Sequence, residues 1–208
     1  MGSRSYRSRR RTEAAAATRG AILAAAEELF VSRGYSCVTV AQIADAAQVA
    51  VQTVYASAGG KADMLRELLL PAVNDPHVEI TQRAIAATDD PREVIDITAR
   101  GTREAHEVHW STLAAVIPQC PSEPAAAAAL DAASAEYVKA LGTIVERLDQ
   151  LGALRADLDQ RRAVDLLWFH LGQDAWFSLV AHRRWSFDDA EEWLTAAAKR
   201  ALLKDPGD

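Results

Sequence analysis

The chain has 208 residues, half of them apolar, and it uses alanine heavily. Such a chain can bury a substantial core in one domain or two. Strand-like alternation of β-branched, aromatic and polar residues is missing, which favours an all-α fold. No apolar run reaches the roughly 20 residues that cross a bilayer, and no signal-peptide segment follows the arginine-rich start, so we expect a cytoplasmic protein without a membrane partner.

The chemistry-bearing motifs of enzymes are also missing. There is no nucleophile elbow, no His-Glu-x-x-His, and the Gly59-Gly60-Lys61 run lacks the glycine spacing of a phosphate-binding loop. Cys37 and Cys120 match no metal or redox spacing and are expected to be reduced packing residues. We therefore expect a protein that is not an enzyme and needs no metal or cofactor.

The charge is divided unevenly along the chain. Residues 1–61 carry eight Lys or Arg against four acids, whereas residues 62–208 carry 15 against 25. A basic N-terminal region followed by an acidic remainder is typical of a DNA-binding domain joined to a different kind of domain. Residues 1–11, with Arg9, Arg10 and Arg11, have no apolar pattern and are expected to form a disordered basic arm. This arm is either a DNA contact or only a solvated tail.

From Thr12 the apolar spacing predicts a first helix that ends at Arg33, where Gly34 suits a left-handed cap. Thr39 and Gln42 then form a capping-box pattern, so a second helix should begin at Val40. A third helix is predicted from residue 51 to 57. Two short helices around a tight turn indicate a helix-turn-helix, whose second helix enters a DNA major groove.

Residues 18–70 resemble the N-terminal domain of the TetR family of bacterial transcriptional regulators. The resemblance rests on an ordered series of motifs over about fifty residues: Phe-x-x-x-Gly-Tyr ending the first helix, Thr-Val-x-x-Ile-Ala, Val-x-x-x-Thr-Val-Tyr, and a Lys opening the fourth helix. It implies a helix-turn-helix domain over residues 12–60, a ligand-binding and dimerisation domain over residues 61–208, and about nine helices in all.

The candidate DNA-binding residues lie around the third helix. Gln52 can pair bidentately with adenine, and Val51 offers an apolar contact to a thymine methyl group. The resemblance implies phosphate contacts from the hydroxyls of Thr53 and Tyr55, although Tyr55 could instead fill the small core. Two further phosphate ligands are expected: Thr39, and Lys61 together with the N–H groups that begin its helix.

Three residues depart from the family pattern. Gln48 stands where the family usually has glycine in the turn, at a cost of about 1 kcal/mol for a left-handed residue with a side chain. Ala50 replaces the usual capping Ser or Thr, a loss of about 1 kcal/mol of helix stability. Ala58 replaces a Phe. These substitutions predict a looser helix-turn-helix than average.

Five or so further helices are expected after residue 74. The segment Asp159 to Arg183 reads as one helix that is apolar nearly all round, and Phe187 to Leu203 as the last helix, with Ser186 as its cap. A helix buried on two sides suggests a second subunit, and the resemblance implies a homodimer interface built from these last two helices. The predicted interface residues are Gly172, Ala175, Trp176, Leu179, Trp193, Leu194, Ala197 and Ala201.

The resemblance also implies a small-molecule pocket in this domain. Polar and aromatic residues that could line it are His106, His109, Trp110, Tyr137, Trp168, His170, Gln173 and Asp174. The alternative for the tryptophans is plain core packing. His106 and His109 are spaced to share a metal, but no further ligand completes such a site.

The expected function is therefore that of a ligand-responsive repressor. It would bind double-stranded DNA at an inverted-repeat operator as a dimer and be released by a small molecule. Two alternatives stay open. The chain could be a helical protein-interaction module without specific DNA binding, because the third helix carries no Arg or Lys, or it could be a regulator that activates or lacks a ligand.

Overall fold

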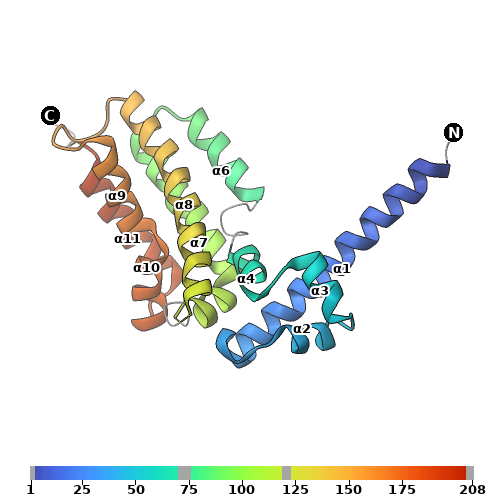
Figure 1. Cartoon of the computed structure of the whole chain (residues 1–208). Coiled ribbons are helices and arrows are strands. Elements are labelled where there is room, and N and C mark those ends of the chain that lie inside the picture. The colour runs from blue at the N-terminus through green and yellow to red at the C-terminus, as the bar shows by residue number, and fades with distance from the viewer. Residues whose placement is uncertain (1–2, 70–75, 119–122, 205–208) are drawn as a thin grey trace. The chain divides into compact units, whose positions relative to one another are not determined.

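The computed structural model describes residues 3–69, 76–118 and 123–204, without the side chains of residues 3–11, 76 and 77. Apart from an isolated bridge between Leu154 and Leu203, the regular structure in these ranges is helical, which confirms the all-α prediction (Figure 1). The helices are, in chain order, α1 (Ser3–Arg33), η1 (Tyr35–Cys37), α2 (Val40–Ala46), α3 (Val51–Ala58), α4 (Lys61–Leu69), α6 (Pro76–Ala87), α7 (Pro91–Val116), α8 (Pro124–Gln150), α9 (Gln160–Leu171), α10 (Gln173–Trp176), η3 (Phe177–His182) and α11 (Phe187–Leu202).

The chain divides into two compact units. The first comprises residues 1–70 and 111–132, and the second comprises residues 71–110 and 133–208. We expected a domain boundary between residues 60 and 61, whereas α4 belongs to the first unit because it packs on α1. Its apolar side chains Met64, Leu65 and Leu69 are buried there.

The first unit is built on α1, against which α2, α3 and α4 pack. Ile22, Ala26 and Phe30 of α1 are fully buried. Gly34 ends the helix with a positive φ of 84°, but its ψ of 144° differs from that of the predicted left-handed cap. The helix begins at Ser3 rather than Thr12, so the expected disordered arm is helical in its backbone. No glycine or proline occurs between Ser3 and Arg19 to interrupt it.

Cys37 does not follow the prediction of a packing residue. Cys37 is exposed, because the inward positions of its segment are taken by the buried Tyr35 and Val38. Cys120 lies outside the described residues.

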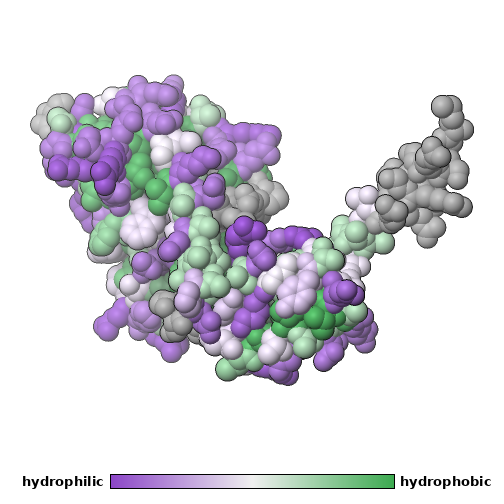
Figure 2. Space-filling model, viewed as in Figure 1, coloured by the Kyte–Doolittle hydropathy of each residue, from purple (hydrophilic) through white to green (hydrophobic). Residues whose placement is uncertain are grey.

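The second unit has its own apolar core, to which α7, α8, α9 and α11 contribute. The cap at Ser186 is confirmed, since its hydroxyl accepts a hydrogen bond from the Asp189 N–H at 3.0 Å. In each unit hydrophilic residues cover much of the visible face, and smaller apolar areas lie among these hydrophilic residues (Figure 2). None of the helices in the described ranges has both the length and the apolar composition needed to span a bilayer.

The prediction of one helix from Asp159 to Arg183 is wrong, because the helix breaks at Gly172. This residue has an extended ψ of 162°, and a Cβ atom there would lie 2.3 Å from the Trp168 carbonyl oxygen, so only glycine fits. The chain resumes as the short α10 and then forms a π-helical turn, η3.

Candidate functional site

The segment from α2 to α3 has the geometry of a helix-turn-helix. The Thr39 hydroxyl accepts from the Gln42 N–H at 3.3 Å, and the Gln42 side-chain oxygen accepts from the Thr39 N–H at 2.8 Å, which confirms the capping box. Gln48 in the turn has a φ of 54°, and Ala50 provides no side-chain cap for α3. Both predicted weak points of the motif are therefore present.

Helix α3 has a buried side and an exposed side. Val54 is fully buried, whereas Val51 and Tyr55 are 42% and 56% exposed. Gln52 is exposed and Thr53 is half-buried. The exposed side thus offers a methyl group, an amide and a phenol, which are groups that contact base edges and phosphates, and it carries no formal charge.

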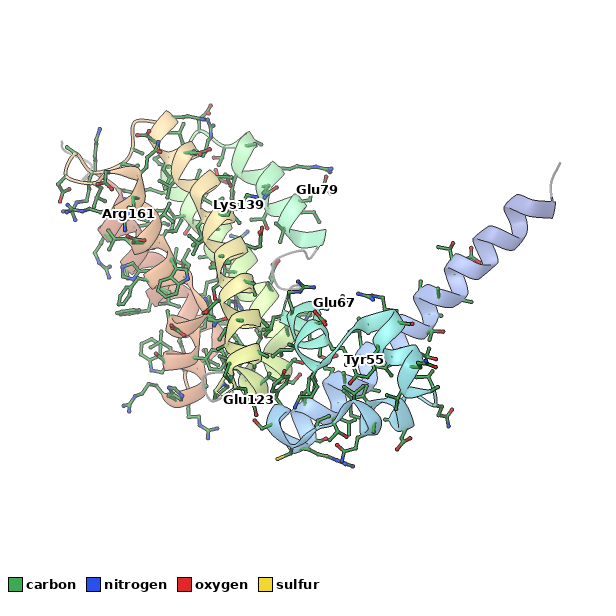
Figure 3. The ribbon with its side chains drawn as sticks, in the orientation of Figure 1. Tyr55, Glu67, Glu79, Glu123, Lys139 and Arg161 are labelled. Atoms are coloured by element: carbon green, nitrogen blue, oxygen red, sulfur yellow. The ribbon has the colours of Figure 1, made fainter. Side chains whose placement is uncertain are left out.

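Tyr55 does not fill the core of the first unit, so that alternative is wrong. The buried aromatic residue there is Tyr35, whose ring centroid lies 5.0 Å from that of Phe30. Tyr55 is exposed on α3 and is accessible to a partner (Figure 3).

Lys61 has an internal partner that the sequence did not reveal. Its Nζ donates a hydrogen bond to the Tyr35 carbonyl at 2.8 Å and lies 4.3 Å from the centroid of the Tyr35 ring. The start of α4 is already supplied with negative charge, because the Asp63 carboxylate accepts from the Gly60 N–H at 2.9 Å. Lys61 therefore ties α4 to η1, and its phosphate contact stays a prediction.

Arg19 is a residue of this site that sequence reasoning missed. Its guanidinium, on α1, donates to the Ser57 carbonyl near the end of α3 and pairs with the Glu67 carboxylate of α4. The two partners are 38 and 48 residues away in sequence, so no local spacing could indicate them. Arg9, Arg10 and Arg11 have side chains outside the described residues.

Two of the residues predicted to line a pocket in the second unit, His106 and Tyr137, belong to a chain of hydrogen bonds that we call the polar ladder. The Tyr137 hydroxyl donates to the Leu171 carbonyl at 3.0 Å and lies 3.2 Å from the Thr102 hydroxyl oxygen. The Nδ1 atom of the buried His106 bonds to the Thr102 carbonyl at 2.8 Å. Burial lowers the pKa of His106 to about 4 and raises the pKa of Tyr137 to about 12, so both side chains are neutral at neutral pH.

Aromatic rings extend this cluster. The Trp176 ring, assigned to the dimer interface by the sequence, is fully buried and stacks on His106 with 5.7 Å between centroids. The centroid of the Trp110 ring lies 5.0 Å from that of Phe177 and 5.2 Å from that of Phe187. We call His106, Trp110, Tyr137 and Trp176 the inner cluster.

The other predicted pocket residues are arranged differently. Asp174 is exposed, and Gln173 and His109 are half-buried. Trp168 packs against the core of the unit. The pKa of His170 is lowered, mainly by burial and to a lesser extent by the nearby charge of Arg200. Among the described residues no group of three His, Cys, Asp or Glu is placed to hold a metal ion.

The residues predicted to form the dimer interface differ in their exposure. Gly172, Trp176, Leu194 and Ala197 are buried within the unit and are not available to a partner. Ala175, Leu179 and Ala201 are half-buried, and Trp193 is 49% exposed. The break at Gly172 changes the direction of the chain before Trp176, which the prediction of one unbroken helix did not allow for.

Two exposed aromatic residues in this part of the chain were not among the predicted interface residues. Phe169 is 67% exposed and Trp185 is 38% exposed, and the Trp185 ring makes an edge contact with Trp193 at 6.4 Å. A hollow of about 570 Å³ opens beside Trp185, Trp193 and Arg200. We call Phe169, Trp185 and Trp193 the outer aromatic patch. These three residues could have been found in the sequence as large apolar residues that remain once the buried positions of each helix have been assigned.

Residues 22–68 match the family described as "Bacterial regulatory proteins, tetR family". No curated protein shows significant sequence similarity to the chain.

Many solved structures share the fold. NalD, the secondary repressor of the MexAB-OprM multidrug efflux pump in Pseudomonas aeruginosa, is 27% identical with a TM-score of 0.69, over 93% of this chain and 99% of that chain. The fatty acid degradation regulator FadR from Bacillus halodurans is 18% identical with a TM-score of 0.71, over 86% and 93%. SmeT from Stenotrophomonas maltophilia, a repressor of a multidrug efflux pump, is 18% identical in its triclosan complex with a TM-score of 0.70, over 91% and 93%.

Proposed function

Because this chain belongs to the TetR family of bacterial regulatory proteins and is a DNA-binding transcriptional regulator, we propose that it is a ligand-responsive repressor. It binds an inverted-repeat operator as a homodimer and is released when a small molecule binds in the second unit. The observation that carries the DNA-binding part is the exposed side of α3, with Val51 and Tyr55 outward and Val54 buried. The family is non-enzymatic, so no reaction is proposed.

DNA recognition divides between α3 and groups outside it. Val51 and Gln52 read base edges, while Thr39, Thr53 and Tyr55 hold phosphates through hydroxyl groups. Because α3 has no cationic side chain, the electrostatic part of the affinity comes from Lys61 and from the arginines at the start of the chain, Arg9, Arg10 and Arg11.

Dimerisation follows from the outer aromatic patch. Large exposed apolar groups mark interaction sites. Trp185 and Trp193 contact each other, and Phe169 lies on α9, which packs on α11. A twofold pair of subunits carries two α3 helices, so it matches an operator with inverted symmetry.

Ligand response is supported by the buried polar groups of the second unit. Buried hydroxyl, imidazole and indole groups among apolar residues are typical of small-molecule sites. NalD and SmeT are repressors of multidrug efflux pumps, SmeT is seen in complex with triclosan, and FadR is a regulator of fatty acid degradation. A small molecule that is largely apolar is the ligand class that fits this setting.

An electrophoretic mobility shift with the DNA upstream of the protein's own gene tests the proposal. We expect binding that weakens steeply with salt and drops by about tenfold or more in Gln52→Ala and Tyr55→Phe, on the scale of one lost direct contact. Gln82→Ala, at an exposed glutamine of α6, is the matched control and should bind as the unchanged protein does. Absent or salt-insensitive binding would overturn the proposal.

The second candidate is a helical protein-interaction module that does not bind DNA specifically. The absence of Arg and Lys from α3 favours it. In that case the shift assay would give the same weak affinity for upstream DNA and for an unrelated duplex, and Gln52→Ala would change neither.

A further inference from the structure

The indole nitrogen of Trp176 is a buried donor without an acceptor. Its side chain is fully buried, and the Nε1 atom has no hydrogen-bond partner in the part of the chain that the structure describes. A buried N–H group that has lost its water and gained no acceptor is unfavourable, and such groups are rare in folded proteins. An acceptor supplied from outside the chain would remove this penalty.

His106 provides the complementary group beside it. The Thr102 carbonyl can only accept a hydrogen bond, so the His106 Nδ1 atom that contacts it at 2.8 Å carries the proton. The ring is neutral, because burial holds its pKa at about 4, and its Nε2 atom therefore carries a lone pair. The His106 ring stacks on Trp176, so a donor and an acceptor belong to adjacent rings.

The surroundings favour an uncharged molecule. The polar groups of the ladder are the Thr102 hydroxyl, the neutral His106 and Tyr137, and the Leu171 carbonyl, none of which is ionised at neutral pH. The cation nearest to them along α7, Arg103, is engaged by Glu107, Asp188 and Glu191. A charged ligand placed here would lose its hydration without gaining a counter-charge.

The backbone around Trp176 is suited to adjustment. Trp176 ends the four-residue α10, between the break at Gly172 and the π-helical turn of η3. Single π-helical turns within helices frequently occur at functional sites. The rings of Phe177 and Phe187 contact Trp110, and an aromatic molecule can pack on such rings.

We propose that Trp176 and His106 form the polar end of a ligand site, and that its ligand is an uncharged aromatic molecule with a hydroxyl group. The hydroxyl oxygen accepts a hydrogen bond from Trp176 Nε1, and the hydroxyl proton is donated to His106 Nε2. This inference rests on the proposed function, in which a small molecule acts on the second unit.

Isothermal titration calorimetry with a defined set of probes tests the site. We expect the full-length protein to bind 1-naphthol or 4-phenylphenol, and to bind the carboxylate 1-naphthoate at least tenfold more weakly. 1-Methoxynaphthalene keeps the acceptor but lacks the donor, and naphthalene lacks both. Affinity should therefore fall from 1-naphthol to 1-methoxynaphthalene and again to naphthalene. If neither phenol binds at millimolar concentration, or if 1-naphthoate binds as tightly as 1-naphthol, the proposal is wrong.

Two substitutions locate the hydrogen bond. Trp176→Phe removes the N–H donor and keeps an aromatic ring, and we expect it to weaken 1-naphthol binding by about tenfold, the scale of one hydrogen bond, with little effect on naphthalene. Ile80→Ala, at an exposed apolar position of α6, is the control and should change neither. Equal affinity of the unchanged protein and Trp176→Phe for 1-naphthol would overturn the assignment. If Trp176→Phe fails to fold, the probe series on the unchanged protein decides alone.

The shift assay separates this inference from the proposed function. A phenol that binds in the calorimeter but leaves the DNA complex intact contradicts ligand-induced release and keeps the site. Specific DNA binding together with no phenol binding contradicts the site and keeps the DNA-binding part of the proposed function.

Discussion

The side chain of His106 makes the stability of the second unit depend on pH. Its pKa in the folded protein is about 4, against 6.5 for an unperturbed histidine, because burial and then the neighbouring His109 oppose the charged form more than the bond to Thr102 favours it. Between these two values the unfolded chain binds a proton that the folded chain does not, so stability rises with pH through this window and is complete above about pH 6.5. Acidification from pH 7.5 to 5 should therefore lower the free energy of unfolding by about 2 kcal/mol through this residue.

Urea unfolding at both pH values measures the effect. In His106→Gln, whose amide can still donate to the Thr102 carbonyl, the difference between pH 7.5 and pH 5 should shrink by that amount. His182→Gln, at an exposed histidine, should leave the difference unchanged. An equal pH dependence in His106→Gln and the unchanged protein would contradict a neutral buried imidazole.

Single residues also mark where sequence reasoning succeeds. The capping box of Thr39 and Gln42 and the left-handed Gln48 follow from local patterns, and the structure confirms both. The roles of Lys61 and Arg19 depend on the carbonyls of Tyr35 and Ser57, which only the tertiary fold brings within reach.

At the scale of one element, α3 lacks a cap that its sequence could easily supply. Ala50 has the extended backbone of an N-cap residue, with a ψ of 147°, but no side-chain oxygen to accept from the helix start. Ala50→Ser should therefore stabilise the first unit by about 1 kcal/mol. Thermal unfolding with amide hydrogen exchange of α3 measures the gain. Ala56→Ser, at an exposed position inside the same helix, is the control and should give no gain.

Arg19 links α3 to α4 through two bonds of one guanidinium. The pair with Glu67 is partly exposed and by itself contributes little, about 0.5 kcal/mol. Its larger effect should be to hold the end of α3 in position. We expect Arg19→Ala and Glu67→Gln each to weaken operator binding by roughly three- to tenfold, with a double variant no worse than Arg19→Ala, because coupled residues are not additive.

The shift assay and thermal unfolding together test this coupling. Arg19→Lys keeps the positive charge but loses the paired N–H donors of the guanidinium. Compared with Arg19→Ala, it should restore stability but only part of the DNA affinity. Arg66→Ala, at the neighbouring exposed arginine of α4, is the control. Strictly additive losses in the double variant would show that the two side chains act independently.

For the whole molecule, the all-helical class and the helix-turn-helix followed from periodicity and motif order, because those depend on local sequence. The break at Gly172 did not follow, since its cause is the close approach of the Trp168 carbonyl. With that break, Trp176, which the sequence assigned to the dimer face, is buried in the second unit and stacks on His106.

The outer aromatic patch carries the last prediction, which concerns assembly. Phe169 is 67% exposed although it is one of the largest apolar side chains on α9, and such a group is stabilised if a second subunit covers it. Phe169→Glu or Trp193→Glu should convert the dimer into monomers, seen by light scattering after size exclusion. Because one subunit engages only half of an inverted repeat, operator affinity should fall by at least about 100-fold, on the scale of the avidity of linked sites. Val108→Glu is the matched control, because Val108 on α7 is also 67% exposed. A dimer that persists in both patch variants would place the interface elsewhere.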